Sequence, residues 1–234
     1  MEVFKADRRV GIASGVALML LVLAVDGLMI WGMSELGISL PAFLLFLLFV
    51  GSFAVLALLG YWAYGLFRSS FHVDRNALVI RWGATTQVVP MGHVTGVLDG
   101  AQAKGIIHFR GALWPGLRVG YGEIEEIGPT LFFATGALQN QVILTTSALS
   151  YALSPADKET FIEAVRQRLS MGPTQAVEQV SRQPVFLTLD FWRDRLGLAL
   201  LIGATILLVA LFGYLSFRYP TLAESQLLHF DANG

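Results

Sequence analysis

The sequence predicts an integral membrane protein with three transmembrane helices and one β-rich module between the second and the third. Two observations carry this prediction. The chain is 55% hydrophobic and only 14% charged, whereas about a quarter of a globular protein is charged. Its apolar residues also gather in three long runs, which lie at residues 10–33, 40–67 and 196–214. Each run approaches or exceeds the roughly 20 residues that a helix needs to cross a bilayer.

Basic residues flank the predicted spans mainly on one side, and this asymmetry predicts the orientation. Only Arg218 lies beyond the opposite ends of the spans. Cytoplasmic loops carry the excess of Lys and Arg, so the N-terminus and the module should be cytoplasmic and the C-terminus outside. The residues on the cytoplasmic side are Lys5, Arg8, Arg9, Arg68, Arg75, Arg81, Arg182, Arg193 and Arg195.

The N-terminal run admits a second interpretation, a cleaved signal peptide, because basic residues lead into it. The run is long for a signal peptide and no clear small-residue cleavage site ends it, which favours an uncleaved anchor. The chain has no cysteine, which excludes disulfides, thiolate nucleophiles and cysteine metal sites. A net charge of −1 gives no electrostatic basis for binding nucleic acid.

Composition divides the chain into five parts. Residues 1–68 form a two-helix transmembrane hairpin, and residues 69–170 form the β module. A polar linker at residues 171–193, which begins with Gly172 and Pro173, should let the module move relative to the spans. Residues 194–217 form the third span, and residues 218–234 form a short extracytoplasmic tail.

Short runs of β-favouring residues, separated by turn residues, occupy the module. This pattern is typical of an antiparallel sandwich or barrel. The predicted strands lie at residues 71–73, 77–82, 86–90, 94–98, 105–109, 130–135, 141–145 and 151–153.

A helix should close the module. Ser154 is the predicted N-cap, Pro155 suits the first helical position, and Asp157 completes a capping pattern. An apolar stripe of Phe161, Ile162, Val165 and Leu169 should cover the open end of the sheet.

Strands followed by one capping helix resemble a bacterial pleckstrin-homology-like (PH-like) domain over residues 71–169. The resemblance implies a PH-like fold and no particular activity. It is carried most strongly by the junction Tyr-Ala-Leu-Ser-Pro-Ala-Asp at residues 151–157, which leads to Phe161. Supporting segments lie at residues 71–73, 78–80, 88–90, 114–120 and 132–135.

The tail resembles the start of a small domain of unknown function that is found in multi-span bacterial membrane proteins. Tyr219-Pro220 and the segment Leu-Leu-His-Phe-Asp-Ala-Asn-Gly at residues 227–234 carry this resemblance. It implies a membrane-stress or immunity-type regulator that senses through its outer tail.

Eukaryotic PH domains bind inositide headgroups through a basic cluster in the first hairpin loop. In this chain that loop is Asp74-Arg75-Asn76. One arginine beside an aspartate is a poor phosphate clamp, so the sequence argues against inositide recognition.

The segment at residues 110–128 is a better candidate surface and should be long and irregular. Arg110, Trp114, Arg118 and Tyr121 combine cationic and aromatic groups, which suit a protein partner or lipid headgroups. The alternative is an ordinary loop that packs on its own sheet. Nearby Glu123, Glu125 and Glu126 argue against docking on an anionic membrane.

Two further sets of residues fall in or near the spans. Asp26 lies within the first span, where a carboxylate is costly; we expect a hydrogen-bonded contact with a neighbouring helix or subunit rather than a proton relay. Trp192, Arg193 and Arg195 precede the third span and should form an interfacial anchor.

The sequence contains no recognisable catalytic, metal or cofactor motif. Its four histidines, His72, His93, His108 and His229, are widely spaced, unlike most metal ligands. We therefore predict a non-catalytic scaffold or accessory subunit without a cofactor. Its partners would be membrane lipids and a protein, or further copies of itself. A transporter would need more polar groups in the spans than Asp26.

Overall fold

A computed structural model describes residues 1–182 and 194–221. The described residues form two compact units. Of the described residues, the first unit contains 1–20 and 57–182, and the second contains 21–56 and 194–221. The β module and the adjoining ends of the first two long helices therefore fold together.

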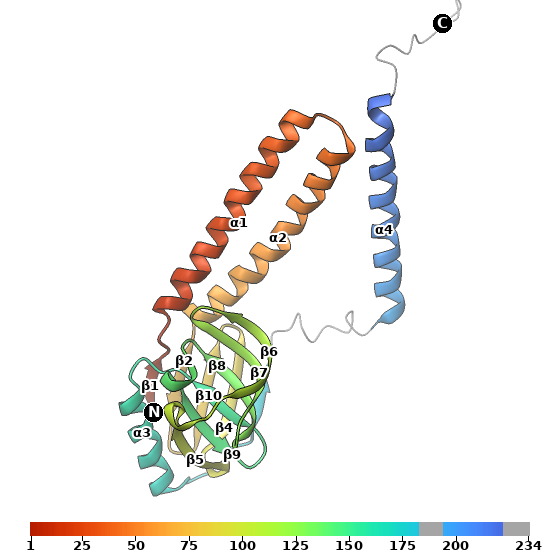
Figure 1. Ribbon diagram of the computed structural model, residues 1–234. Coiled ribbons are helices and arrows are strands. Elements are labelled where there is room, and N and C mark those ends of the chain that lie inside the picture. The colour runs from red at the N-terminus through yellow and green to blue at the C-terminus, as the bar shows by residue number, and fades with distance from the viewer. Residues whose placement is uncertain (183–193, 222–234) are drawn as a thin grey trace, which may run out of the picture. The chain divides into compact units, whose positions relative to one another are not determined.

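Three long apolar helices lie where the sequence predicts the spans (Figure 1). They are α1 (Arg9–Leu36), α2 (Leu40–Phe67) and α4 (Arg195–Arg218). Each is long and apolar enough to cross a membrane. Asp194 caps α4, since its carboxylate accepts hydrogen bonds from the backbone N–H groups of Leu196 and Gly197. A short 3₁₀ turn, Tyr219–Thr221, follows α4.

The module contains two sheets. The first is antiparallel throughout, with strand order β1-β2-β3-β4-β11. Its two edge strands lie far from the others in sequence, since β1 precedes the first long helix and β11 follows the module's own helix. The strands are β1 (Glu2–Lys5), β2 (Ser70–Val73), β3 (Ala77–Trp82), β4 (Thr85–Pro90) and β11 (Val180–Arg182).

The second sheet has the order β5-β9-β10-β8-β7-β6 and is antiparallel except for the parallel pair β8 and β10. The 3₁₀ turn Met91–His93 connects the first sheet to this one. Two more 3₁₀ turns, Gly100–Gln102 and Leu138–Asn140, lie between its own strands. The strands are β5 (Val94–Asp99), β6 (Ile106–Trp114), β7 (Leu117–Ile124), β8 (Gly128–Ala134), β9 (Val142–Thr146) and β10 (Ser150–Leu153).

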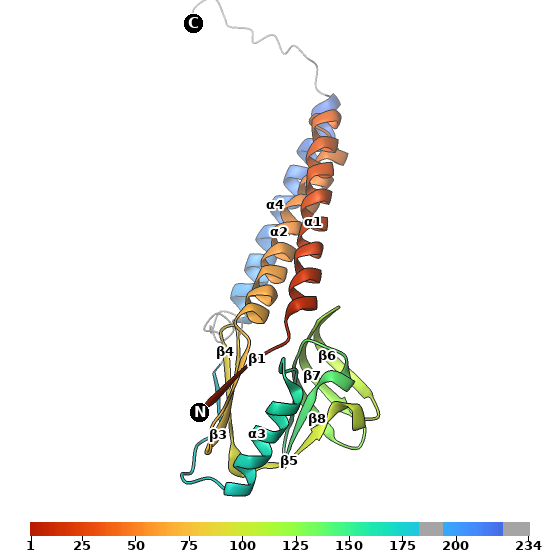
Figure 2. The ribbon, with the colours of Figure 1, turned by 90° about the vertical axis from the view of Figure 1, so that its left-hand side faces the viewer.

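One hydrophobic core joins both sheets to helix α3 (Lys158–Met171). Figure 2 shows α3 across the opening between the two sheets. Its apolar stripe is buried, with Phe161 fully covered and Val165 nearly so. This arrangement confirms the predicted fold class, a sheet-rich module closed by a C-terminal helix. The largest fully buried side chains include Phe71, Phe132, Leu66 and Tyr151.

Helix α3 begins later than the sequence predicts. Its N-cap is Asp157, whose carboxylate accepts from the backbone N–H of Thr160. The predicted cap, Ser154, is wrong because its hydroxyl accepts from the backbone N–H of Thr135 instead. Pro155 is likewise outside the helix, since it forms a β-bridge with Ala6. Contacts with distant strands therefore hold these two residues in extended structure.

Besides β7, two short strands at the edges of the first sheet lie where the sequence predicts none. β1 forms from residues 2–5 and pairs with β2, and β11 forms within the predicted linker and pairs with β4. The Gln87 side chain donates to the Ser181 hydroxyl at 2.6 Å, and Gln179 donates to the buried Tyr151 hydroxyl at 3.1 Å. The chain on both sides of the module thus takes part in its fold.

Candidate interaction site on the β6–β7 hairpin

The predicted partner-binding residues lie on the hairpin of β6 and β7. The sequence-based prediction of a long irregular segment is wrong, because residues 110–124 lie almost entirely in these two strands. They pair from Trp114 and Leu117 at the tip to Ile106 and Ile124 at the far end. A tight turn at Pro115 and Gly116 connects them, with Gly116 at a φ of 83°, a value that glycine adopts readily.

The hairpin tip packs directly against the start of α1. The Ser14 hydroxyl donates a hydrogen bond to the Pro115 carbonyl. Gly11 and Gly116 lie backbone to backbone, since a Cβ on Gly11 would come within 2.2 Å of the Gly116 carbonyl oxygen. Such a close approach leaves no room for a side chain on either residue. The glycines therefore fix the hairpin tip to the helix.

Aromatic packing continues this contact onto the end of α2. The rings of Trp62 and Trp114 meet edge to face at 5.4 Å between centroids, a favourable arrangement for aromatic pairs. Trp82 of β3 lies against Gly65, where an added Cβ would come within 2.5 Å of its indole nitrogen. Leu66 is fully buried in the module's core. We call the contacts of the hairpin tip with Gly11, Ser14 and Trp62 the helix joint.

Arg110 and Tyr121 instead lie on an outer face of the hairpin. They are direct cross-strand neighbours in the β6–β7 register, and Tyr121 is 58% exposed. A shallow cavity of about 220 Å³ lies around them. It is lined by His108, Arg110, Tyr121, Gly122, Glu123 and Pro129. We call this surface the outer face; it offers a cation, a carboxylate and an aromatic ring to a partner.

Arg118 and Trp114 have other roles. The Arg118 guanidinium lies over the Phe109 ring at 6.0 Å from its centroid, and burial lowers the pKa of Arg118 below its ordinary value. Trp114 is half-buried, and its covered indole nitrogen has no hydrogen-bond partner among the described residues. The four predicted residues thus divide between the helix joint, a cation–π contact and the outer face.

The predicted residues of the spans are only partly described. Asp26 is 5% exposed within α1, and one of its carboxylate oxygens has no hydrogen-bond partner in the described part of the chain. The expected hydrogen-bonded contact therefore stays a prediction. Arg195 is the first residue of α4, whereas Trp192 and Arg193 lie outside the described residues. The tail segment that resembles a second domain, residues 227–234, also lies outside them.

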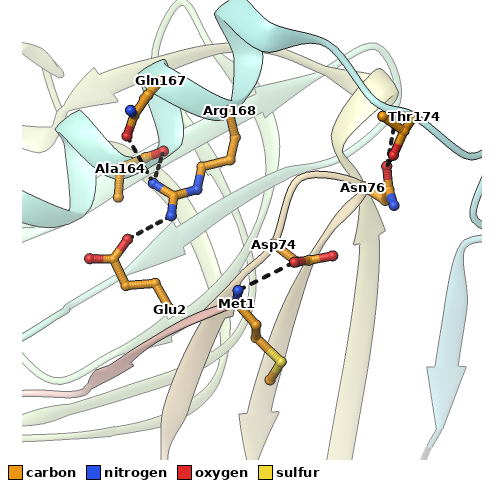
Figure 3. Close-up of polar contacts among 8 residues, drawn as sticks. All are labelled: Met1, Glu2, Asp74, Asn76, Ala164, Gln167, Arg168 and Thr174. Carbon is orange, nitrogen blue, oxygen red and sulfur yellow. Dashed lines mark hydrogen bonds and ion pairs between the residues drawn. The ribbon is translucent and has the colours of Figure 1, made fainter.

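The first hairpin loop of the module is engaged in contacts within the chain. Arg75 donates to the carbonyls of Gly172 and Met171, and the Asn76 carboxamide oxygen accepts from the backbone N–H of Thr174 at 2.8 Å. Asp74 lies 3.6 Å from the N-terminal amine. These contacts, drawn in part in Figure 3, hold the chain on both sides of the module to this loop.

Within the described residues, no group of three or more His, Asp or Glu side chains lies close enough to hold a metal ion. His72 is nearly buried in β2, and one ring nitrogen lies 3.1 Å from the Ser70 hydroxyl. Two causes lower the pKa of His72 below its ordinary value of 6.5. The larger is desolvation by burial, and the smaller is the positive charge of Arg81. Its burial fits a structural role in the sheet.

The two sheets and closing helix define a PH-like module. Residues 69–169 match the model of the family described as bacterial PH domain, which agrees with the resemblance seen over residues 71–169. The match runs from the start of β2 to the last turn of α3. It leaves out β1, β11 and the three long helices. No curated protein and no solved structure matches the chain.

Proposed function

We propose that this protein is a non-catalytic membrane scaffold or accessory subunit, which holds a protein partner against the outer face of its PH-like module. The observation that carries the proposal is the division of the β6–β7 hairpin. Its tip is fixed to α1 and α2 by the helix joint, while Arg110 and Tyr121 remain available to a partner.

The composition of the outer face supports a protein partner. Tyr and Arg are enriched among the residues that dominate binding energy in protein interfaces. The outer face also adjoins an open edge of the second sheet, since β6 is an edge strand. Glu123 lines the same cavity, which disfavours an anionic lipid surface as the ligand.

The proposed location is the cell membrane, with the N-terminus and the module in the cytoplasm. The strand pairing of β1 with β2 supports placing both on the same side. Two helices of 28 residues separate these strands, so the chain would cross the membrane twice and return. The excess of basic residues beside the module supports the cytoplasmic side.

Single-cysteine labelling tests this orientation cleanly because the chain has no cysteine of its own. One variant is Ser39→Cys, in the turn before α2. The other is Arg166→Cys, at an exposed position of α3. In intact cells, a membrane-impermeant maleimide should label the first variant and spare the second until the cells are lysed. The reverse pattern would overturn the proposed orientation.

Purification in a gentle detergent, followed by mass spectrometry of co-purifying proteins, tests the scaffold role. The native chain should retain at least one protein in stoichiometric amount. Arg110→Glu combined with Tyr121→Ala should release it, whereas the matched charge reversal Arg166→Glu on α3 should not. A native chain that purifies alone, or a partner retained by the double variant, would contradict the proposed function.

A further inference from the structure

The N-terminal strand β1 occupies a groove at the edge of the first sheet. It lies outside the segment that matches the PH family, yet it pairs with β2 along four residues, from Glu2 opposite Val73 to Lys5 opposite Ser70. Figure 2 shows β1 running towards the start of α1. We call the site that β1 fills between β2 and α3 the strand groove.

An aromatic side chain anchors β1 in the strand groove. The Phe4 ring meets Phe161 of α3 edge to face at 5.1 Å between centroids. Phe161 in turn contacts Phe71 of β2 at 6.0 Å, and both of these rings are fully buried. Without β1, the floor of the groove would be an apolar surface beside an unpaired strand edge, which is a ready template for another strand.

Charged groups fix the direction of β1 in the groove. Glu2 forms an ion pair with Arg168 of α3 at 2.8 Å, and Arg168 also donates to the Ala164 carbonyl. These contacts appear in Figure 3. At the other end, the backbone N–H of Asp7 donates to the Ser154 carbonyl. The groove thus binds an acidic residue and, two positions later, an aromatic residue.

Several features of β1 resemble those of a bound peptide. The strand has only four residues, and its outward side is free, with Val3 55% exposed. The ion pair of Met1 with Asp74 is exposed at both partners and that of Glu2 with Arg168 at Glu2, and exposed pairs contribute little. Addition of an extended segment to a sheet edge is a common mode of peptide recognition, in which the backbone supplies affinity and alternate side chains supply specificity.

We propose that the strand groove is a peptide-binding site, and that residues 1–7 are its resident ligand. The external ligand would be an extended segment of a partner protein with an acidic residue two positions before an aromatic one. This site is separate from the outer face and does not depend on the partner proposed there. Because α1 begins at Arg9, displacement of β1 would also release the chain just before the first span.

A labelled peptide copy of residues 1–8 (Met-Glu-Val-Phe-Lys-Ala-Asp-Arg, free N-terminal amine, fluorophore at the C-terminus) tests the proposal on the full chain in nanodiscs. The release variant Glu2→Lys/Phe4→Ala should bind the peptide at least tenfold more tightly than the native chain. The matched control Val3→Ala, on the free side of β1, should bind it as weakly as the native chain does.

Charge reversal gives a readout that a merely structural role would not change. In a second release variant, Glu2→Ala/Phe4→Ala, which carries no charge of its own at position 2, the additional change Arg168→Glu should weaken binding of the native peptide several-fold. It should strengthen binding of a peptide that carries lysine in place of Glu2 by a similar factor. Glu2→Lys alone alters only a surface contact and should fold if the double variant does not; we expect it to bind the peptide several-fold more tightly than the native chain.

Two results would overturn the proposal. The first is a folded Glu2→Lys or release variant that binds the peptide no better than the native chain, with folding verified by hydrogen exchange in β9 and β10. The second is a release variant that forms a dimer by mass photometry and excludes the peptide, because the groove would then be filled by strand exchange between copies.

Discussion

The helix joint and the strand groove both attach the PH-like module to the first long helix, but by different means. At the helix joint, two glycine backbones lie in contact and two tryptophan rings pack together. At the strand groove, a four-residue strand is held by one aromatic anchor and surface ion pairs. The first attachment leaves no space for exchange, whereas the second is the one that we propose can open to a peptide. The two attachments therefore make different predictions for the same module.

The largest effect should come from adding a side chain at the helix joint. In Gly116→Val, the new Cβ would come within 2.3 Å of the Gly11 backbone nitrogen, at a φ that valine adopts poorly. We expect a loss of about 3 kcal/mol in the free energy of unfolding, measured by denaturant titration in mild detergent. Gly105→Ala is the control, since its Cβ would meet nothing within 4 Å. Equal stability of both variants would contradict the close packing.

Removal of an aromatic ring at the joint should have a smaller effect. Trp114→Ala would lose the contact with Trp62 and leave a cavity, costing about 2 kcal/mol because the ring is only half-buried. Tyr121→Ala, on the exposed outer face, should change stability by less than about 0.5 kcal/mol. If both variants lost the same stability, the division of the hairpin would be wrong.

The ion pair of the strand groove should contribute less to the free energy of unfolding than the packing at the helix joint does. A double-mutant cycle on Glu2 and Arg168 should give a coupling free energy below about 1 kcal/mol, because the Glu2 side chain is 43% exposed and solvent weakens the pair. The exchanged pair, Glu2→Arg with Arg168→Glu, should recover most of the lost stability. A coupling free energy of several kcal/mol would mean that β1 is a fixed part of the sheet.

The smallest effect should be a pH dependence that arises from His72 of β2. Because its pKa in the folded module lies below the ordinary value of 6.5, the unfolded chain binds a proton more readily. The contribution of His72 to the free energy of unfolding should therefore be fully present above pH 6.5 and should decline as the pH falls below it. His72→Gln should flatten this part of the unfolding profile measured between pH 7.5 and 5; an unchanged slope would assign the dependence to other groups.

Much of the fold could be predicted because its signals are local. The spans follow from long apolar runs, and β2 to β5 and β8 to β10 follow from short β-favouring runs between turn residues. Strand β7 was missed because Gly120 and Gly122 lower its β-propensity. The structure explains these residues: Gly120 meets Gly111 of β6 backbone to backbone, and Gly122 lies against Phe132.

The remaining errors concern contacts between distant parts of the chain. β1 and β11 are too short to stand out in the sequence and become strands only by pairing with β2 and β4. The helix cap moved from Ser154 to Asp157 because Thr135 uses the Ser154 hydroxyl. For the candidate site, the residue types were informative. Only the pairing of β6 with β7 shows that Trp114 lies at the tip, whereas Arg110 and Tyr121 lie farther along the hairpin, on the outer face.

Hydrogen exchange on the full chain in nanodiscs tests the contrast between the two attachments most directly. We expect the backbone amides of β1 and their partners on β2 to exchange well before those of the β6–β7 tip, and free peptide of residues 1–8 to leave exchange at the tip unchanged. Protection of β1 equal to that of the tip would contradict a releasable β1, because both attachments would then open only when the whole module unfolds.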